Sequence, residues 1–398
     1  MVRQGHLADS VVEAASPPAS VSQRPDGYVY GLDLVRFATA LIVTFYHLTR
    51  HDPRITHPAL FGWVGVQIFF VISGIVIANS AAVAKPWPYV KGRILRLYPA
   101  VWVVAPASLI AILAYNGFDQ ELPFNFLRSM TLSPVGPWLA SAYWTLPIEV
   151  AFYVLVLVVL RLGQMARIER VAIGLAFYSL AYLTIYGLHL SGVIHLSHIE
   201  LGTGAKDMTL LRHGVFFALG IFAWLWSVGR LSRLGLASAF LATIGGCVEI
   251  AAKAFELAGK LRPPIDLRAA WLIPVLIWLA ACALMLGALN WRAAVAKMPQ
   301  PILRSFRAAG LATYPLYLSH EALGLGGLQL LITAGASPWL SVIATASGLI
   351  VFALLVALVV EPLIRGGMRK WFSTLEKQLA SCGARIATKR DSQPPPCE

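Results

Sequence analysis

The first hydrophobic segment of the chain reads Gly31-Leu-Asp-Leu-Val-Arg36-Phe-Ala-Thr-Ala-Leu-Ile-Val-Thr-Phe-Tyr-His47-Leu48. Ionisable side chains inside a membrane-spanning helix are costly, so they usually face a bundle interior or a wet cavity where they have a function. Arg36 and His47 are eleven residues apart, which is about three helical turns and roughly 16 Å along the helix axis. We therefore expect one buried helix face that carries a permanent cation near one end and a titratable base near the other.

The composition of the whole chain is that of a membrane protein. Of its 398 residues, 58% are hydrophobic and 13% are charged, and this charged fraction is about half that of a soluble domain. The apolar stretches are long and do not alternate with period two, so they predict helices rather than the strands of an outer-membrane barrel. Spans are expected at 31–49, 63–81, 94–114, 142–160, 171–190, 211–228, 235–252, 270–289, 310–333 and 338–360. The predicted fold class is an all-α, polytopic membrane bundle of about ten transmembrane helices.

The net charge of +13 gives the bundle a predicted orientation. Lys and Arg gather in the connections after the second, fourth, sixth and eighth expected spans and in the C-terminal region, although 253–269 is also basic. The positive-inside rule makes the side that carries most of this charge cytoplasmic, with both termini on that side. Membrane orientation thus explains the charge, and no nucleic-acid partner is expected.

Three parts are expected along the chain. Residues 1–27 are polar and lack the apolar core of a cleavable signal peptide. Residues 28–372 form the transmembrane domain, and residues 373–398 are predicted to be a basic, disordered cytoplasmic tail. No cysteine or histidine pair has the spacing of a metal site, so no metal is expected.

Two arginines, Arg93 and Arg96, are candidate ligands for an anion. They lie three residues apart at the start of the third expected span, where they share one side of the helix. Arginine binds phosphate through two parallel hydrogen bonds. The spacing alone also fits an ordinary basic anchor at the membrane surface, which is the commoner arrangement.

Glu149 and His320 are the other candidate site residues. Glu149 lies about two turns into the fourth expected span, where a buried carboxylate must be paired or protonated. It could orient a histidine or receive a hydroxyl. His320 lies in the ninth expected span with Glu321 beside it, and a hydrogen-bonded core histidine without a catalytic role is an equally good interpretation.

Small residues in the second span have a simpler explanation. Gly65, Ser73 and Gly74 are expected to allow close helix packing, as such residues usually do in membranes. Glu249, in the seventh expected span, has no partner that the sequence reveals.

Taken in order, these segments resemble the acyltransferase-3 family of integral membrane acyltransferases over residues 28–372. The motifs are Leu32-Asp33 through Arg36 to His47, Phe69-Phe70-Val-Ile-Ser73-Gly74, Arg93-x-x-Arg96 with Tyr98-Pro99, Trp144-Thr-Leu-Pro-Ile-Glu149-Val-Ala-Phe152-Tyr153, Tyr314-Pro-Leu-Tyr317-Leu-Ser-His320, and Glu361-Pro362 at the close of the last helix. Each motif is weak alone, whereas the ordered set on a ten-span chain is specific.

The resemblance implies transfer of an acyl group, usually acetyl, from cytoplasmic acyl-CoA to a hydroxyl of a cell-surface or lipid-linked carbohydrate such as exopolysaccharide or lipopolysaccharide. It implies a multi-pass protein of the bacterial cytoplasmic (inner) membrane with no permanently bound cofactor. Its partners would be acyl-CoA as donor substrate, a carbohydrate acceptor, the lipid bilayer and polysaccharide-biosynthesis proteins. The family's essential arginine and histidine fall on Arg36 and His47, and its Arg-x-x-Arg pair falls on Arg93 and Arg96.

A mechanism follows as a hypothesis. Arg36, Arg93 and Arg96 would bind the phosphates of acyl-CoA at the cytoplasmic mouth, and the pantetheine arm would run outward along the first span. His47 would act as general base, because an imidazole pKa suits proton transfer near neutral pH. Glu149 or His320 would orient His47 or hold a sugar hydroxyl.

Two other classes of protein remain open from the residues alone. A proton-coupled transporter or flippase of a lipid-linked glycan would also bury Arg, His and Glu in about ten spans. The sequence shows no repeat between its halves, which argues against that class. A sensor or interaction protein would show no turnover and no dependence on CoA.

Overall fold

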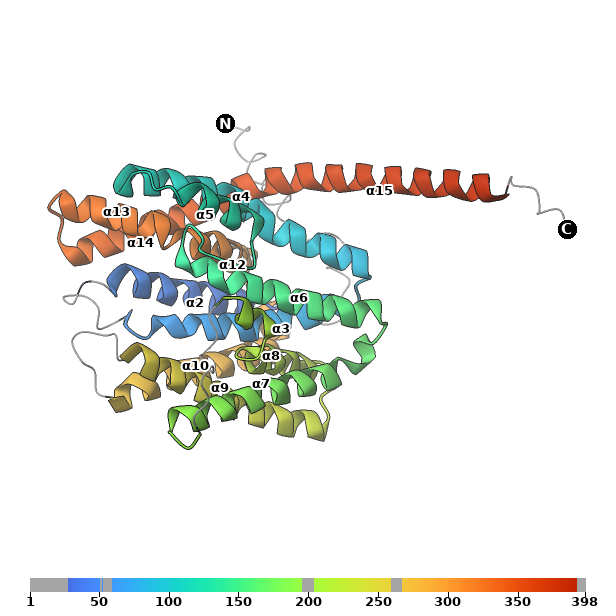
Figure 1. Ribbon diagram of the computed structural model, residues 1–398, viewed down its shortest axis with the longest axis horizontal. Helices are drawn as coiled ribbons and strands as arrows, with labels where there is room; N and C mark the ends of the chain where they lie inside the picture. The colour runs from blue at the N-terminus through green and yellow to red at the C-terminus, as the bar shows by residue number, and fades with distance from the viewer. Residues whose placement is uncertain (1–27, 51, 53–58, 195–203, 259–266, 392–398) are drawn as a thin grey trace.

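The computed structural model describes residues 28–50, 52, 59–194, 204–258 and 267–391. The predicted polar segment 1–27 and the last seven residues of the predicted tail lie outside these ranges. Within them, all regular secondary structure is helical, which confirms the predicted all-α class (Figure 1).

Nine helices in the described part of the chain are long and apolar enough to cross a membrane. They are built from α2 (Tyr30–Thr49), α3 (Gly65–Ala81), α4 (Pro86–Asn116), α6 (Thr145–Arg161), α7 (Ile168–Leu190), α8 (Gly214–Ser227), α9 (Arg233–Ala258), α10 (Leu267–Asn290), and α14 (Pro338–Leu355) continued by α15 (Glu361–Asp391). Shorter helices are α5 (Leu122–Thr131), α11 (Arg292–Val295), α12 (Gln300–Ser319) and α13 (Ala322–Thr333). A multi-pass helix bundle is therefore present.

The expected ninth span, 310–333, is not one helix. α12 ends at Ser319 and α13 begins at Ala322, so the chain turns at His320 and Glu321. α12 also begins at Gln300 and includes Arg304 in its first turns. The prediction of a single span is wrong here, because a hydropathy window averages over a break of two residues.

The end of the chain also differs from expectation. α14 passes through a π-helical segment, Val356–Val360, into α15, so Glu361-Pro362 lies inside a continuous helix instead of closing one. Pro362 has no backbone N–H, so it cannot make the usual helical hydrogen bond to the residue four positions earlier. The π-helical turn directly before Glu361 is where the helix departs from regular α geometry. Figure 1 shows α15 extending beyond the bundle.

Residues 373–391 are helical, whereas the sequence predicted a disordered tail from residue 373. Side-chain contacts hold this helix against the start of α4. Glu376 Oε1 accepts hydrogen bonds from Trp87 Nε1 at 2.6 Å and from Lys91 Nζ at 3.0 Å. The ring of Phe372 packs against Trp87, with ring centroids 5.9 Å apart.

Helix α2 lies in the interior of the bundle, where it packs against α3 and α12, and α3 in turn packs against α8 (Figure 1). Gly74 of α3 and Gly220 of α8 face one another so closely that a Cβ on either would overlap the other helix's backbone. A Cβ on Gly65 would likewise overlap Val43 of α2. The predicted packing role of Gly65 and Gly74 is confirmed.

A buried ion pair ties α8 to α9. Glu249 of α9 accepts a hydrogen bond from Arg212 Nε at 2.7 Å, just before α8, and one from Gln67 Nε2 of α3 at 3.2 Å. None of these three residues is more than 7% exposed. The acid for which the sequence offered no partner is therefore paired with an arginine 37 positions away.

Candidate active site

A pocket with about 570 Å³ of empty space lies between α2, α3, α4, α6 and α12; we call it the central pocket. Its walls are Arg36, Val66, Phe69, Phe70, Ile72, Ser73, Arg96, Thr145, Leu146, Glu149, Thr313, Tyr314 and Tyr317. Most of these residues belong to the motifs that carry the family resemblance, so those motifs meet in space although they are scattered along the chain.

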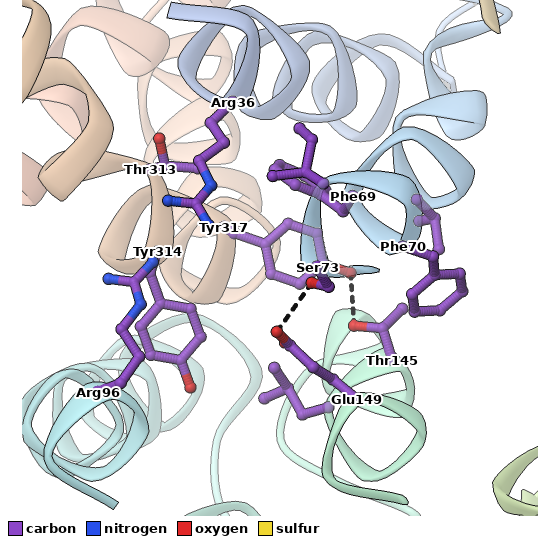
Figure 2. Close-up of a pocket in the computed structure, with 13 residues that line it drawn as sticks. Arg36, Phe69, Phe70, Ser73, Arg96, Thr145, Glu149, Thr313, Tyr314 and Tyr317 are labelled. Carbon is purple, nitrogen blue, oxygen red and sulfur yellow. Dashed lines mark hydrogen bonds between the residues drawn. The ribbon is translucent and has the colours of Figure 1, made fainter. Parts of the chain in front are cut away.

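Two arginines point into the central pocket from different helices. Figure 2 shows Arg36 of α2 and Arg96 of α4 with their guanidinium groups directed toward the same space. Arg96 lies over the ring of Tyr314, 5.4 Å from its centroid. Because Glu149 is the one carboxylate in the wall, the pocket has a net positive charge and suits an anionic or strongly polarised group.

Glu149 is held by two hydroxyl donors. Ser73 Oγ of α3 donates to Glu149 Oε1 at 2.9 Å (Figure 2). The hydroxyl of Tyr153, one turn further along α6, donates to the same oxygen at 2.6 Å. Sequence reasoning assigned Ser73 to helix packing, and the structure corrects this, because its side chain donates a hydrogen bond to the part-buried Glu149. Glu149 is therefore placed beside the arginines of the pocket.

Arg93 and Arg96 diverge. Residues three apart differ by about 60° around a helix, and here that angle sends them to different pockets. Arg93 lies over the rings of Tyr89 and Tyr153, at 5.5 and 5.6 Å from the centroids, and lines a mostly apolar pocket between α4 and α6. Of the pair, Arg96 lines the central pocket.

The far end of α2 carries a second polar cluster, formed by two histidines and an acid. His47 Nδ1 is 3.8 Å from Glu321 Oε1, and the rings of His47 and His320 meet edge to face with centroids 4.8 Å apart. Arg50 Nη2 is 3.4 Å from the same carboxylate oxygen. The structure thus brings together His47 and His320, one of the two residues that the sequence analysis considered as a partner of His47, and adds Glu321 as the carboxylate that faces His47.

Glu321 is fixed by the residues that precede α6. Ser141 Oγ donates to both carboxylate oxygens, at 2.7 and 2.8 Å, and the backbone N–H of Ala142 donates to Oε2 at 2.9 Å. The side chain is mostly buried and reaches these donors because the chain turns between α12 and α13. Sequence reasoning noted this acid beside His320 but gave it no role; an acid at the end of an apolar stretch was the available signal.

Tyr317 joins the two clusters. Its ring lines the central pocket, and its hydroxyl makes a 2.9 Å hydrogen bond with Thr145 Oγ1 (Figure 2). The same hydroxyl donates to Ala142 O at 3.2 Å, and the ring centroid lies 5.5 Å from that of His320. Its carbonyl is 2.6 Å from His320 Nδ1. A carbonyl can only accept, so Nδ1 is the nitrogen that donates here, and in the neutral ring the lone pair is then on Nε2. That Nε2 is buried and makes no hydrogen bond within the described ranges.

The comparisons with known proteins agree with the motifs. The family model for an acyltransferase domain, acyltransferase-3, matches residues 29–361. The chain belongs to the acyltransferase-3 family. Together with the helices described above, this makes it a multi-pass membrane protein of an acyltransferase family.

Two kinds of curated relatives are similar to the chain. The exopolysaccharide production protein ExoZ of Rhizobium meliloti is 26% identical over 332 residues, which cover 78% of this chain and 92% of ExoZ. Provisionally named O-acetyltransferases from several Staphylococcus aureus strains, including COL, are 27% identical over 235 residues, or 52% of this chain. The match spans 36% of the length of these staphylococcal relatives. No solved structure matches the chain.

Proposed function

We propose that the protein transfers an acyl group, in the first instance acetyl, from cytoplasmic acyl-CoA to a hydroxyl of a cell-surface or lipid-linked carbohydrate. The observation that carries the proposal is the arrangement along α2. A cationic pocket surrounds Arg36 near one end, and the His47–Glu321 pair lies at the other. The names of the relatives, an O-acetyltransferase and an exopolysaccharide production protein, support this acyl group and this acceptor class.

The proposed chemistry centres on His47 as general base. With Nδ1 facing Glu321 Oε1, Nε2 is the nitrogen that we assign to the acceptor hydroxyl. Nε2 takes the hydroxyl proton, the oxygen attacks the thioester carbonyl, and the C–S bond breaks. The departing thiolate then receives the proton from His47, which yields the ester and CoA thiol. Such general-base assistance raises the reaction rate by about 10²- to 10⁴-fold.

Glu321 is the proposed positioning residue for this step. A carboxylate beside Nδ1 stabilises the imidazolium that forms when His47 takes a proton, and it selects the ring orientation. The separation of 3.8 Å is longer than a hydrogen bond, and catalytic hydrogen bonds often tighten only when substrate is bound. Glu149, which the sequence analysis considered for this role, partners Ser73 and Tyr153 instead.

The central pocket is the proposed site of the thioester arm. Arg36 and Arg96 lie at its polar end, and Tyr317 and Phe69 form the wall toward the histidines. We place the acceptor on the opposite side of the membrane from the donor, since the arginines and His47 lie toward opposite ends of α2. The protein would lie in the bacterial cytoplasmic membrane with both termini in the cytoplasm, near polysaccharide-biosynthesis proteins.

The test is release of CoA thiol by the purified protein in nanodiscs, with acetyl-CoA and a pool of cell-envelope glycans. Wild type should release thiol and label the glycan, and His47→Gln should do neither while still binding CoA. No release from folded wild type across varied acceptors would contradict the proposal and favour a glycan transporter, the second candidate.

A further inference from the structure

A second and larger cavity opens beside the central pocket; we call it the vestibule. It has about 930 Å³ of empty space and lies where α2 begins, between the ends of α3 and α8 and the region of α10 and α12. Its polar walls come from Tyr28, Asp33, Arg36, Asn79, Ser80, Ser227, Arg292 and Arg307. Arg36 belongs to both walls, so the two cavities meet at this side chain.

The vestibule is strongly cationic. Three arginines, Arg36, Arg292 and Arg307, face a single carboxylate, that of Asp33, among its lining residues. Asp33 is 2% exposed. Its Oδ1 lies 3.9 Å from Arg36 Nη1, and its Oδ2 lies 3.7 Å from Arg307 Nη1. One acid cannot neutralise three cations, and a cleft with such an excess attracts an anion carrying more than one charge.

Tyr28 connects Asp33 and Arg307 through hydrogen bonds. The hydroxyl of Tyr28 donates to Asp33 Oδ2 at 2.6 Å and accepts a hydrogen bond from Arg307 Nη1. Burial raises the pKa of the Tyr28 phenol, and so does the charge of Asp33, which keeps the donor protonated. The guanidinium of Arg307 also lies over the Tyr28 ring, 4.8 Å from its centroid.

Two side-chain details point to a phosphate. Arg307 Nε makes no hydrogen bond to any described residue, and the side chain is 29% exposed, so this guanidinium has donor capacity that its protein neighbours do not use. Arg292 is anchored through Nη1 to Ser227 O at 3.2 Å, which fixes the planar fork at the wall of the vestibule. The guanidinium group is planar and matches the geometry of a phosphate, which it can bind through two parallel hydrogen bonds.

We propose that the vestibule holds the phosphorylated nucleotide end of the acyl-CoA donor, with Arg292 and Arg307 as phosphate ligands. The inference rests on the proposed function. The donor carries its phosphates at one end and its thioester at the other, and the two cavities have the matching order. The arm passes Arg36 into the central pocket, toward His47. Arg93, which the sequence analysis assigned to the phosphates, lines neither cavity.

The test compares two donors. Acetyl-CoA carries the phosphates, and S-acetylpantetheine has the same thioester arm without them. For Arg292→Gln and Arg307→Gln, KM for acetyl-CoA should rise about ten-fold or more, the usual effect of losing a charge-assisted hydrogen bond. KM for S-acetylpantetheine should not change, which also shows that the variants fold. Arg304→Gln is the matched control, because Arg304 lies one turn before Arg307 on the same helix and is exposed.

An unchanged KM for acetyl-CoA in both variants would overturn the inference and leave the proposed function intact; an anionic lipid headgroup in the vestibule predicts this result. An equal rise for both donors would overturn it too, since the effect would not depend on phosphate. If wild type turns over neither donor, binding of adenosine 3′,5′-bisphosphate decides separately. Weaker binding to Arg307→Gln than to wild type and Arg304→Gln supports the vestibule site, and equal or absent binding refutes it.

Discussion

Replacing Glu321 by Gln removes one negative charge beside His47 and changes the shape of the side chain very little. The amide oxygen can still accept from Ser141 and from the N–H of Ala142, so the contacts that hold the side chain against the start of α6 remain. Arg50 Nη2, 3.4 Å from Oε1, loses this ion pair, and its side chain is 27% exposed. The substitution therefore isolates the electrostatic contribution of the carboxylate.

The magnitude follows from the distance. At the 3.8 Å between His47 Nδ1 and Glu321 Oε1, a unit charge pair is worth about 4 kcal/mol at an effective dielectric constant of about 20. The His47 side chain is 12% exposed, so water screens part of this. A barrier increase of about 3–4 kcal/mol lowers kcat about 10²- to 10³-fold.

The assay is steady-state thiol release with acetyl-CoA. We expect kcat to fall by that factor, and KM for acetyl-CoA to stay the same because Glu321 lines neither the central pocket nor the vestibule. Ser141→Ala is the comparison variant: it removes a donor to Glu321 but keeps the charge, so its effect should be smaller. An unchanged kcat in folded Glu321→Gln, or a loss confined to KM, would refute the assignment.

Three further predictions follow from the packing and the pocket. Arg212→Ala should lower the free energy of unfolding by about 3–5 kcal/mol, because it leaves the buried Glu249 without its cation; an unchanged melting curve in detergent would contradict this. Gly220→Leu should abolish folded yield in size-exclusion chromatography by forcing α8 from α3, whereas Gly348→Leu, which points into open space, should not. Arg96→Gln should raise KM for acetyl-CoA more than it lowers kcat, and an unaltered KM would remove Arg96 from the donor site.

The sequence was sufficient to predict the helices and the separation of Arg36 and His47 along one of them. Apolar stretches of the right length predicted the spanning helices, and the eleven-residue spacing placed Arg36 and His47 toward opposite ends of one helix. The family resemblance followed from the order of short motifs, and the matched family model confirms it. These features depend on local spacing, which a single sequence records directly.

The pairing of side chains depends on packing between distant helices, which spacing does not record. Ser73 and Glu149 are 76 positions apart, and their hydrogen bond requires α3 and α6 to lie side by side. Arg93 and Arg96 share one side of a helix in sequence, yet the packing of α4 sends them into separate pockets. Glu321 faces His47 because the chain turns between α12 and α13. A hydropathy profile does not show a break of two residues.

The most direct test of the central claim follows the acyl group itself. Wild type and His47→Gln in nanodiscs receive isotopically labelled acetyl-CoA and the cell-envelope glycan pool, and the glycans are then analysed by mass spectrometry. The account predicts that label appears as a glycan ester in step with thiol release, for wild type and not for His47→Gln. Thiol release without labelled glycan, or label transfer that persists in His47→Gln, would contradict it.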